Sequence, residues 1–412
     1  MISDCRLLDL TDYRCWLCGK ILAELGCEVI KIERPGGDPG RRLGPFYGGK
    51  PDPQRSLTWF AYNTSKKGIT LNIEAPDGRE IFKRLVATTD FVIESFPPGY
   101  LDERGIGYAA LSEINPRLIL TSITPFGQDG PYRNFKGAHI VLVALSGLMY
   151  LIGDPDRPPL QTGFPLAYVQ ACGQGASATM MAYYARERDG KGQHVDVSMH
   201  HSAAMWPLTA VPVWHMEGVK LRRAGQRREG RTVTGANPRY IWPCKDGYVT
   251  FSVGGGPIYV RSLQSLVEWM DSERMAGDFL RQHDWSAFDM SRITESLLQQ
   301  VEEPIAQFFL SHTKAELFDG ATKRRIILFP VSSLKDIAED VQLHAREFWA
   351  EVEYEELGVS ITQLGFFAKT TNIPCSIRHR APFIGEHNED VYCGELGLSR
   401  DDLTMLAQTG VV

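Results

Sequence analysis

The stretch from Gln161 to Ala203 carries the strongest fold signal, and it reads QTGFPLAYVQACGQGASATMMAYYARERDGKGQHVDVSMHHSA. Small and apolar residues from Ala176 to Arg186 predict a helix, which ends in a charged run and Gly190. The segment from His194 to Met199 alternates polar with apolar residues, as a half-buried strand does. The stretch therefore predicts a loop, a core helix and a strand, an arrangement that requires no chemistry by itself.

The N-terminal region predicts a parallel sheet with crossover helices. Two strands, Arg6–Leu10 and Glu28–Glu33, flank a helix from about Trp16 to Gly26. A strand, a helix and an apolar strand in this order favour a right-handed βαβ unit. Ligand sites of open α/β sheets lie beyond the carboxyl ends of the strands, so the cationic Gly/Pro loop 34–42 is a candidate phosphate site. The alternative is an ordinary solvated loop.

Composition and charge indicate a globular cytoplasmic protein. The chain has 412 residues, 43% of them hydrophobic, so we expect two or three domains. A net charge of −6 provides no basic field for nucleic acid or an anionic membrane surface. The start Met1–Arg6 does not resemble a signal peptide, and no apolar run approaches the ~20 residues of a membrane span. We therefore expect neither a nucleic-acid nor a membrane partner.

The cysteines predict no metal site. Eight of them are spread over the whole length, as is typical of reduced cytosolic thiols. Cys15 and Cys18 have the spacing of a zinc or redox motif, but zinc would need a second ligand pair with similar spacing, which the sequence lacks. We interpret the two cysteines as small residues at the start of a helix.

Several motifs, in order along the chain, resemble those of the family III CoA-transferases. They are LGCEVIKIERPGGDPGR (25–41), NPRLILTSITPFG (115–127), RERDGKGQHVDVS (186–198) and APFIGEHNED (381–390). The resemblance covers nearly the whole chain. It implies an α/β fold with a large Rossmann-like domain from both chain ends, residues 1–205 and 329–412, and a smaller α+β domain over 206–328. It also implies an interlocked dimer, coenzyme A or an acyl-CoA as substrate, and no metal.

The resemblance also shows that the family's nucleophile is missing. Family members carry a catalytic Asp in the loop before the central helix, and counting back 25 positions from Gln193 gives Tyr168. In the family this carboxylate attacks the acyl-CoA thioester, and transfer proceeds through mixed anhydrides and an aspartyl-CoA thioester. A phenol has a pKa near ~10 and cannot form an anhydride. We therefore predict no catalytic residue at this position.

His139 is the other candidate for chemistry. It stands where most relatives carry an acidic residue beside the active site, although a lone histidine is more often simply packed or solvated. The family's racemases have their catalytic histidine one position earlier, which is Ala138 here. Together with the missing Asp, this argues against a racemase.

The candidate CoA contacts come from the cationic loop and from the family resemblance. The cationic loop contributes Arg34, and the resemblance adds Lys66, Phe96, Arg104 and Lys136. Two positions depart from the family pattern, because Ser95 replaces the usual Asn and Arg104 follows the position of the family's Arg by one residue.

The N-terminal pattern adds a hypothesis about partners. The segment CGKILAELGCEVIKIERPGGDPGR (18–41) lacks the usual AGP turn and is similar to that of family members built from two homologous subunits, such as those acting on benzylsuccinate. The leading hypothesis is a subunit of a heteromeric CoA-transferase that moves CoA between an acyl-CoA such as succinyl-CoA and a carboxylic acid such as benzylsuccinate. A homologous partner subunit would supply the Asp. The alternatives are a homodimeric CoA-thioester-binding protein, or an acyl-CoA lyase or isomerase that uses Tyr168 or His139.

Overall fold

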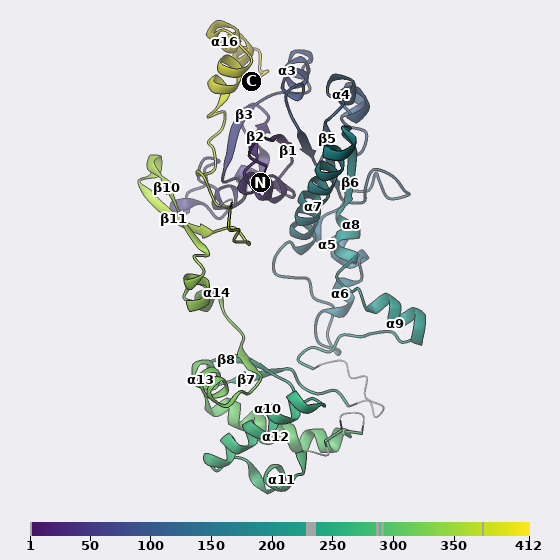
Figure 1. The fold of residues 1–412 in the computed structure, drawn as a ribbon, viewed down its shortest axis with the longest axis vertical. Helices are drawn as coiled ribbons and strands as arrows, with labels where there is room; N and C mark the ends of the chain where they lie inside the picture. Colours follow the sequence, from purple (N-terminus) through teal and green to yellow (C-terminus); the bar gives the residue numbers. More distant parts are fainter. Residues whose placement is uncertain (1, 228–235, 286–287, 290–291, 373–374) are drawn as a thin grey trace. The chain divides into compact units, whose positions relative to one another are not determined.

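The chain forms two compact units (Figure 1). The computed structural model describes residues 2–227, 236–285, 288–289, 292–372 and 375–412. One unit comprises Met1–Leu148, Thr162–Trp206 and Val341–Val412, and the other comprises Met149–Gln161 and Pro207–Asp340. These bounds differ from the predicted divisions because the Arg223 guanidinium donates to the carbonyls of Tyr150 and Asp154, which ties 149–161 to the second unit.

A six-stranded parallel sheet forms the centre of the first unit. Its order is β3-β2-β1-β4-β5-β6, and every pairing is parallel. The strands are β1 (Arg6–Leu10), β2 (Glu28–Glu33), β3 (Lys66–Thr70), β4 (Phe91–Glu94), β5 (Ile119–Thr124) and β6 (His194–Ser198). This is the doubly wound order of Rossmann-like folds. The predicted α/β class with a Rossmann-like domain is confirmed.

Helices cover both faces of this sheet. One face packs on α3 (Pro76–Val86), α4 (Tyr108–Ile114) and α16 (Arg400–Gln408) through an apolar core that includes Phe82, Leu111 and Leu406. The other face packs on α1 (Trp16–Glu24) and α7 (Leu166–Asp189), where the hydroxyls of Thr121 and Thr179 lie 2.7 Å apart. Shorter helices complete the unit: α2 (Leu57–Tyr62), α5 (His139–Leu145), α8 (Met199–Ala204) and α15 (Val341–Ala345).

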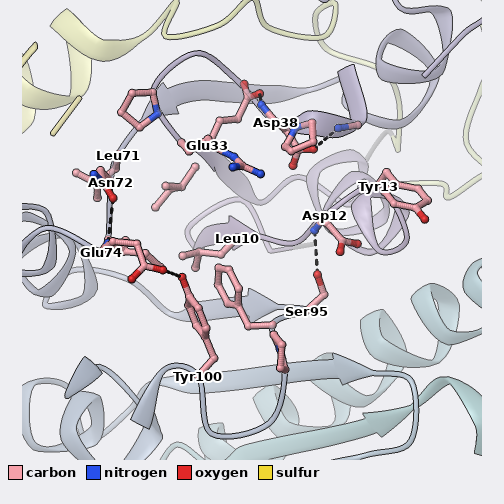
Figure 2. A pocket seen from close by; sticks show the side chains of 18 of the residues that line it. Leu10, Asp12, Tyr13, Glu33, Asp38, Leu71, Asn72, Glu74, Ser95 and Tyr100 are labelled. Carbon is pink, nitrogen blue, oxygen red and sulfur yellow. Dashed lines mark hydrogen bonds between the residues drawn. The ribbon is translucent and has the colours of Figure 1, made fainter. Parts of the chain in front are cut away.

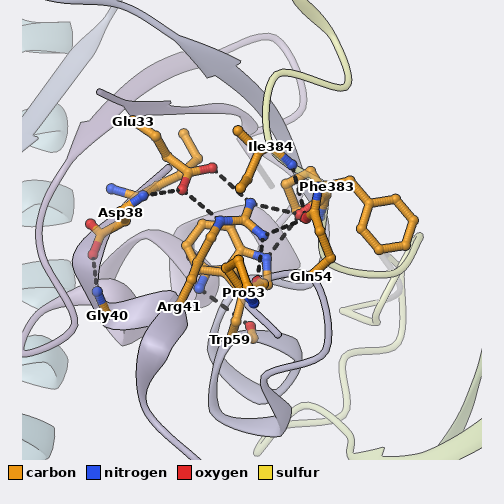
Figure 3. A network of polar contacts seen from close by, with 12 residues as sticks. Glu33, Asp38, Gly40, Arg41, Pro53, Gln54, Trp59, Phe383 and Ile384 are labelled. Carbon is orange, nitrogen blue, oxygen red and sulfur yellow. Dashed lines mark hydrogen bonds and ion pairs between the residues drawn. The ribbon is translucent and has the colours of Figure 1, made fainter. Parts of the chain in front are cut away.

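Residues from the two ends of the chain pack together in the first unit (Figure 3). Buried Arg41 forms a bidentate ion pair with Glu33, lies 3.5 Å from the centre of the Trp59 ring and donates to the Pro382 carbonyl at 2.9 Å. Nearby, the hairpin of β10 (Trp349–Tyr354) and β11 (Val359–Leu364) packs on α2, with the rings of Phe60 and Tyr354 4.2 Å apart. The C-terminal segment is therefore part of the N-terminal core.

The second unit has its own core around a three-stranded antiparallel sheet, β7 (Ile241–Cys244), β8 (Gly247–Phe251) and β9 (Leu328–Pro330). The predicted hairpin around Lys245–Gly247 is confirmed. The helices of the second unit are α9 (Ala210–Glu217), α10 (Pro257–Ser272), α11 (Gly277–Gln282), α12 (Glu295–Ser311), α13 (Lys314–Arg324) and α14 (Leu334–Ala338). Buried Trp242, Trp269 and Phe309 lie at its centre. Across the described part of the chain, no helix combines the length and apolarity that crossing a membrane requires.

The central helix is longer than predicted. α7 begins at Leu166, so Tyr168 lies in the first helical turn and not in the loop before the helix, where it was expected. The loop is shorter than expected because Pro165 stands directly at the start of the helix, where its missing amide hydrogen costs no helical hydrogen bond. A Cβ on Gly175 would lie 2.8 Å from Ile123 Cδ1, so the glycine permits close contact between α7 and β5.

A buried charge network fixes α1 against the sheet. Asp9 of β1 lies 2.8 Å from Lys66 Nζ and 3.5 Å from Lys31 Nζ, and all three side chains are essentially buried. Lys66 also donates to the carbonyl of Trp16 at the start of α1. A Cβ on Gly19 would lie 2.2 Å from Asp9 Oδ2, so α1 can approach the carboxylate only because residue 19 has no side chain.

Gly19→Ala should therefore destabilise the protein. The alanine gains ~1 kcal/mol in helix propensity, but displacing a paired buried carboxylate costs ~3 kcal/mol or more. We expect a net loss of about 2 kcal/mol in the free energy of unfolding, measured by urea denaturation. Gly173→Ala in α7 is the matched control, since a Cβ there meets nothing within 4 Å. Equal stabilities of the two variants would contradict the packing argument.

Candidate functional site

A pocket of about 640 Å³ lies beyond the carboxyl ends of β1 to β4 (Figure 2). Strand order reverses between β1 and β4, and open α/β sheets bind ligands at such switch points. Its walls come from the segments that follow these strands. They include Asp12, Tyr13 and Arg14 after β1, Arg34 and Asp38 after Glu33 at the end of β2, Asn72 and Glu74 after β3, and Ser95, Phe96 and Tyr100 after β4.

Polar contacts link the loops across the switch point. The Asp12 amide donates to Ser95 Oγ at 2.9 Å (Figure 2). Arg14 pairs with Asp12 at 2.6 Å and donates to the Ser95 carbonyl at 3.3 Å. The loops after β1 and β4 are thereby held together at the base of the pocket.

One wall is a stack of three side chains. The rings of Phe96 and Tyr100 are stacked 4.3 Å apart, and the Arg104 guanidinium lies 3.5 Å from the centre of the Tyr100 ring. The Glu74 carboxylate accepts from the Tyr100 hydroxyl and from Arg104 Nε. Burial and the Glu74 carboxylate raise the pKa of Tyr100 to about 12. The hydrogen bonds from Tyr100 and Arg104 lower the pKa of Glu74, so its exposed carboxylate stays ionised and paired with Arg104 at this wall.

Of the cations in loop 34–42, Arg34 is the one that faces the pocket. Arg41 is buried on Glu33 and Trp59, and Arg42 is exposed outside the lining. Arg34 is exposed, and among the described residues no ion pair is formed with it. It is therefore available to an anionic ligand.

The predicted CoA-binding residues are divided among three environments. Arg34 and Phe96 line the pocket, and Arg104 stacks on the lining residue Tyr100. Lys66 lies beneath the pocket in the Asp9 network, fully buried, and Lys136 is exposed and does not contribute to the lining. The structure thus brings three of the five together, and their contacts with CoA stay predictions.

Tyr168 and His139 form a separate aromatic cluster beside the pocket. Tyr168 is 7% exposed and makes edge-on contacts with the rings of Tyr13 at 6.3 Å and His139 at 5.7 Å. Burial raises the pKa of Tyr168 to about 12 and lowers the pKa of His139. His139 Nε2 is buried and has no hydrogen-bond partner among the described residues. Both side chains are uncharged at neutral pH, so neither can replace a carboxylate nucleophile.

Sequence reasoning missed much of the pocket lining. Asp12, Tyr13, Glu74 and Tyr100 were not predicted, although each lies within a few residues of a strand's carboxyl end. Closeness to the end of a predicted strand was the signal that could have identified these residues from the sequence.

In the described ranges, His, Cys, Asp and Glu side chains nowhere gather in groups of three or more that could hold a metal ion.

Comparison with known proteins agrees with the fold. The family model for CoA-transferase family III matches residues 2–388. Succinyl-CoA:(R)-benzylsuccinate CoA-transferase subunit BbsE from Thauera aromatica is 33% identical, with 97% of this chain and 95% of that protein covered. The beta subunit of succinyl-CoA–L-malate CoA-transferase from Chloroflexus aurantiacus is 30% identical, with 96% and 94% covered. The crystal structure of a CAIB/BAIF family protein from Brucella suis superposes with a TM-score of 0.80 at 26% identity, covering 95% and 98% of the two chains.

Tyr168 should resist nitration by tetranitromethane, which attacks phenolates. Its burial and raised pKa keep it protonated at mildly alkaline pH. Tyr184 on the same helix is 70% exposed and serves as the internal control. Peptide mapping by mass spectrometry should find Tyr184 nitrated at least roughly tenfold faster, because burial limits access of the reagent to Tyr168 and a pKa of about 12 leaves that residue little phenolate. Similar rates at both residues would contradict this description of the site.

Proposed function

This chain belongs to CoA-transferase family III, and we propose that it is the subunit of a heteromeric CoA-transferase that does not carry the nucleophile. It moves CoA, together with its partner, between succinyl-CoA and a carboxylic acid such as benzylsuccinate. The partner is a homologous chain with Asp where this chain has Tyr168. The two chains interlock, as the family resemblance implies.

The relatives support a paired assembly. The benzylsuccinate enzyme of Thauera aromatica is represented by a named subunit. The malate enzyme of Chloroflexus aurantiacus has an alpha and a beta subunit, which are 27% and 30% identical to this chain. Because both subunits of that enzyme are similar to this chain, they are homologous to each other. The relatives of this chain therefore include an enzyme with two homologous subunits, as proposed here.

The observation that carries the proposal is the buried phenol of Tyr168. In transfer, a carboxylate attacks the acyl-CoA carbonyl and expels the CoA thiolate, which leaves an acyl anhydride. The thiolate then attacks the enzyme carbonyl, releases the first acid and forms an enzyme–CoA thioester. The acceptor carboxylate attacks this thioester and expels the thiolate, which leaves a second anhydride. The thiolate then attacks the acceptor carbonyl of that anhydride, which forms the new acyl-CoA and frees the enzyme carboxylate. A protonated phenol with a pKa of about 12 supports none of these steps.

The pocket beyond β1 to β4 is proposed to bind the CoA moiety. Arg34 supplies an unpaired positive charge for a phosphate, and the Phe96–Tyr100 stack supplies a flat apolar wall. The volume of about 640 Å³ is in the range of small-molecule sites.

Arg34→Ala should weaken CoA binding by roughly tenfold or more, because a charge-assisted hydrogen bond to phosphate is lost. Isothermal titration calorimetry measures the affinity. Arg42→Ala is the matched control, since it removes the same charge from the same loop at an exposed position outside the pocket lining. Equal weakening in both variants would point to long-range charge effects and not to contact by Arg34.

Native mass spectrometry of untagged protein purified from its source organism tests the partnership. We expect a complex in which a second chain of similar mass accompanies this one and carries Asp at the position aligned with Tyr168. A clean homodimer would overturn the heteromeric assignment and favour a CoA-binding protein or an enzyme that uses Tyr168 or His139.

A kinetic comparison in the intact complex completes the test. Tyr168→Phe should keep CoA transfer within about threefold of wild type, because the removed hydroxyl is not the nucleophile. The partner's Asp→Asn variant should lose transfer. Loss of activity on Tyr168→Phe alone, by more than about a hundredfold, would assign the chemistry to this chain.

A further inference from the structure

Glu94 is a buried carboxylate directly beneath the pocket wall. It is the last residue of β4, it is 4% exposed, and it lies between Leu10 of β1 and Ser122 of β5 in the sheet register. The next residues of the chain, Ser95 and Phe96, line the pocket. A change in the charge of Glu94 therefore acts directly on the residues that form the pocket wall.

The carboxylate holds the backbone of this wall. Glu94 Oε2 accepts a hydrogen bond from the Phe96 amide at 2.6 Å. Ser122, which is paired with Glu94 in the sheet register, acts to lower the pKa of the carboxylate, and its Oγ lies 2.9 Å from His194 Nε2 on β6. The carboxylate thus holds the amide of Phe96, whose ring stacks on Tyr100.

The charges that face Glu94 favour its neutral form. Asp102 and Asp196 are both acidic and act in the same direction as burial. His194 does not offset them, because burial lowers the pKa of its imidazole. On the neighbouring loop, the charges of Asp12 and Arg14 are paired with each other. Burial, only partly opposed by Ser122 and by the hydrogen bond from the Phe96 amide, raises the pKa of Glu94 to about 7.

We propose that Glu94 is a positioning residue whose ionised carboxylate holds the Phe96 wall in its ligand-binding shape, so that ligand binding in the pocket weakens as the solution is acidified through neutrality. The ionised form is the stronger acceptor for the Phe96 amide, and protonation weakens that bond. Binding is therefore strongest on the alkaline side and decreases on the acid side. The choice of CoA as ligand rests on the proposed function.

Calorimetric titration of CoA across neutral pH tests the proposal. Wild-type affinity should fall by about fivefold from the alkaline to the acid side, the equivalent of one net hydrogen bond. Glu94→Gln should respond less to pH, because its amide oxygen still accepts from Phe96 and does not titrate. Ser122→Ala should move the wild-type midpoint to higher pH, because it removes a hydroxyl that lowers the pKa of the carboxylate. Protonation of CoA itself affects all variants alike and cancels in the comparison.

Identical pH profiles for wild type and Glu94→Gln would overturn the role of Glu94. Absence of CoA binding at every pH would instead overturn the proposed function. In that case, hydrogen exchange in the ligand-free protein tests whether Glu94 positions the wall. The protection of the peptide that contains Phe96, corrected for the intrinsic pH dependence of exchange, should fall on the acid side in wild type and stay constant in Glu94→Gln. Parallel protection in the two proteins would overturn the proposal.

Discussion

The ion pair between Asp9 and Lys66 is the contact on which the first unit most depends. It joins β1 to β3 across β2, whose Lys31 approaches the same carboxylate. Burial acts to raise the pKa of Asp9, but the two lysines outweigh it and lower that pKa, so the carboxylate stays ionised. A buried charge is tolerated only with such partners. Because Asp9 also accepts from the Thr11 amide, the network sets the start of the loop that forms the pocket base.

Local sequence patterns were sufficient for the sheet but not for the details of the site. The strands Arg6–Leu10 and Glu28–Glu33 were predicted at their observed bounds, because apolar runs between turn residues reflect local burial. The helical position of Tyr168 was missed, since Gly163 and Pro165 just before it are typical of a loop. Lys66 was expected at a ligand, yet it lies in the core because its counter-charge Asp9 is 57 positions away. A pairing between residues so far apart in the chain cannot be predicted from a single sequence.

In the proposed function, the groups that bind CoA are separate from the position of the family's nucleophile. Arg34 and the Phe96–Tyr100 wall lie at the strand ends, where the CoA moiety is proposed to bind. The Tyr168 cluster is reached through Tyr13, which lines the pocket and contacts the Tyr168 ring. A chain can therefore lose its nucleophile without disturbing the groups proposed to hold CoA. This arrangement is what a division of labour between homologous subunits requires.

The packing of Arg41 and Trp59 on Pro382 sets the order in which the chain can fold during synthesis. In most multidomain proteins the N-terminal domain emerges first and folds first. Here the N-terminal strands emerge early, but the Pro382 carbonyl that Arg41 and Trp59 bind emerges more than 300 residues later, whereas the second unit is complete once Asp340 has left the ribosome. The core of the first unit can therefore close only after the whole second unit has been synthesised.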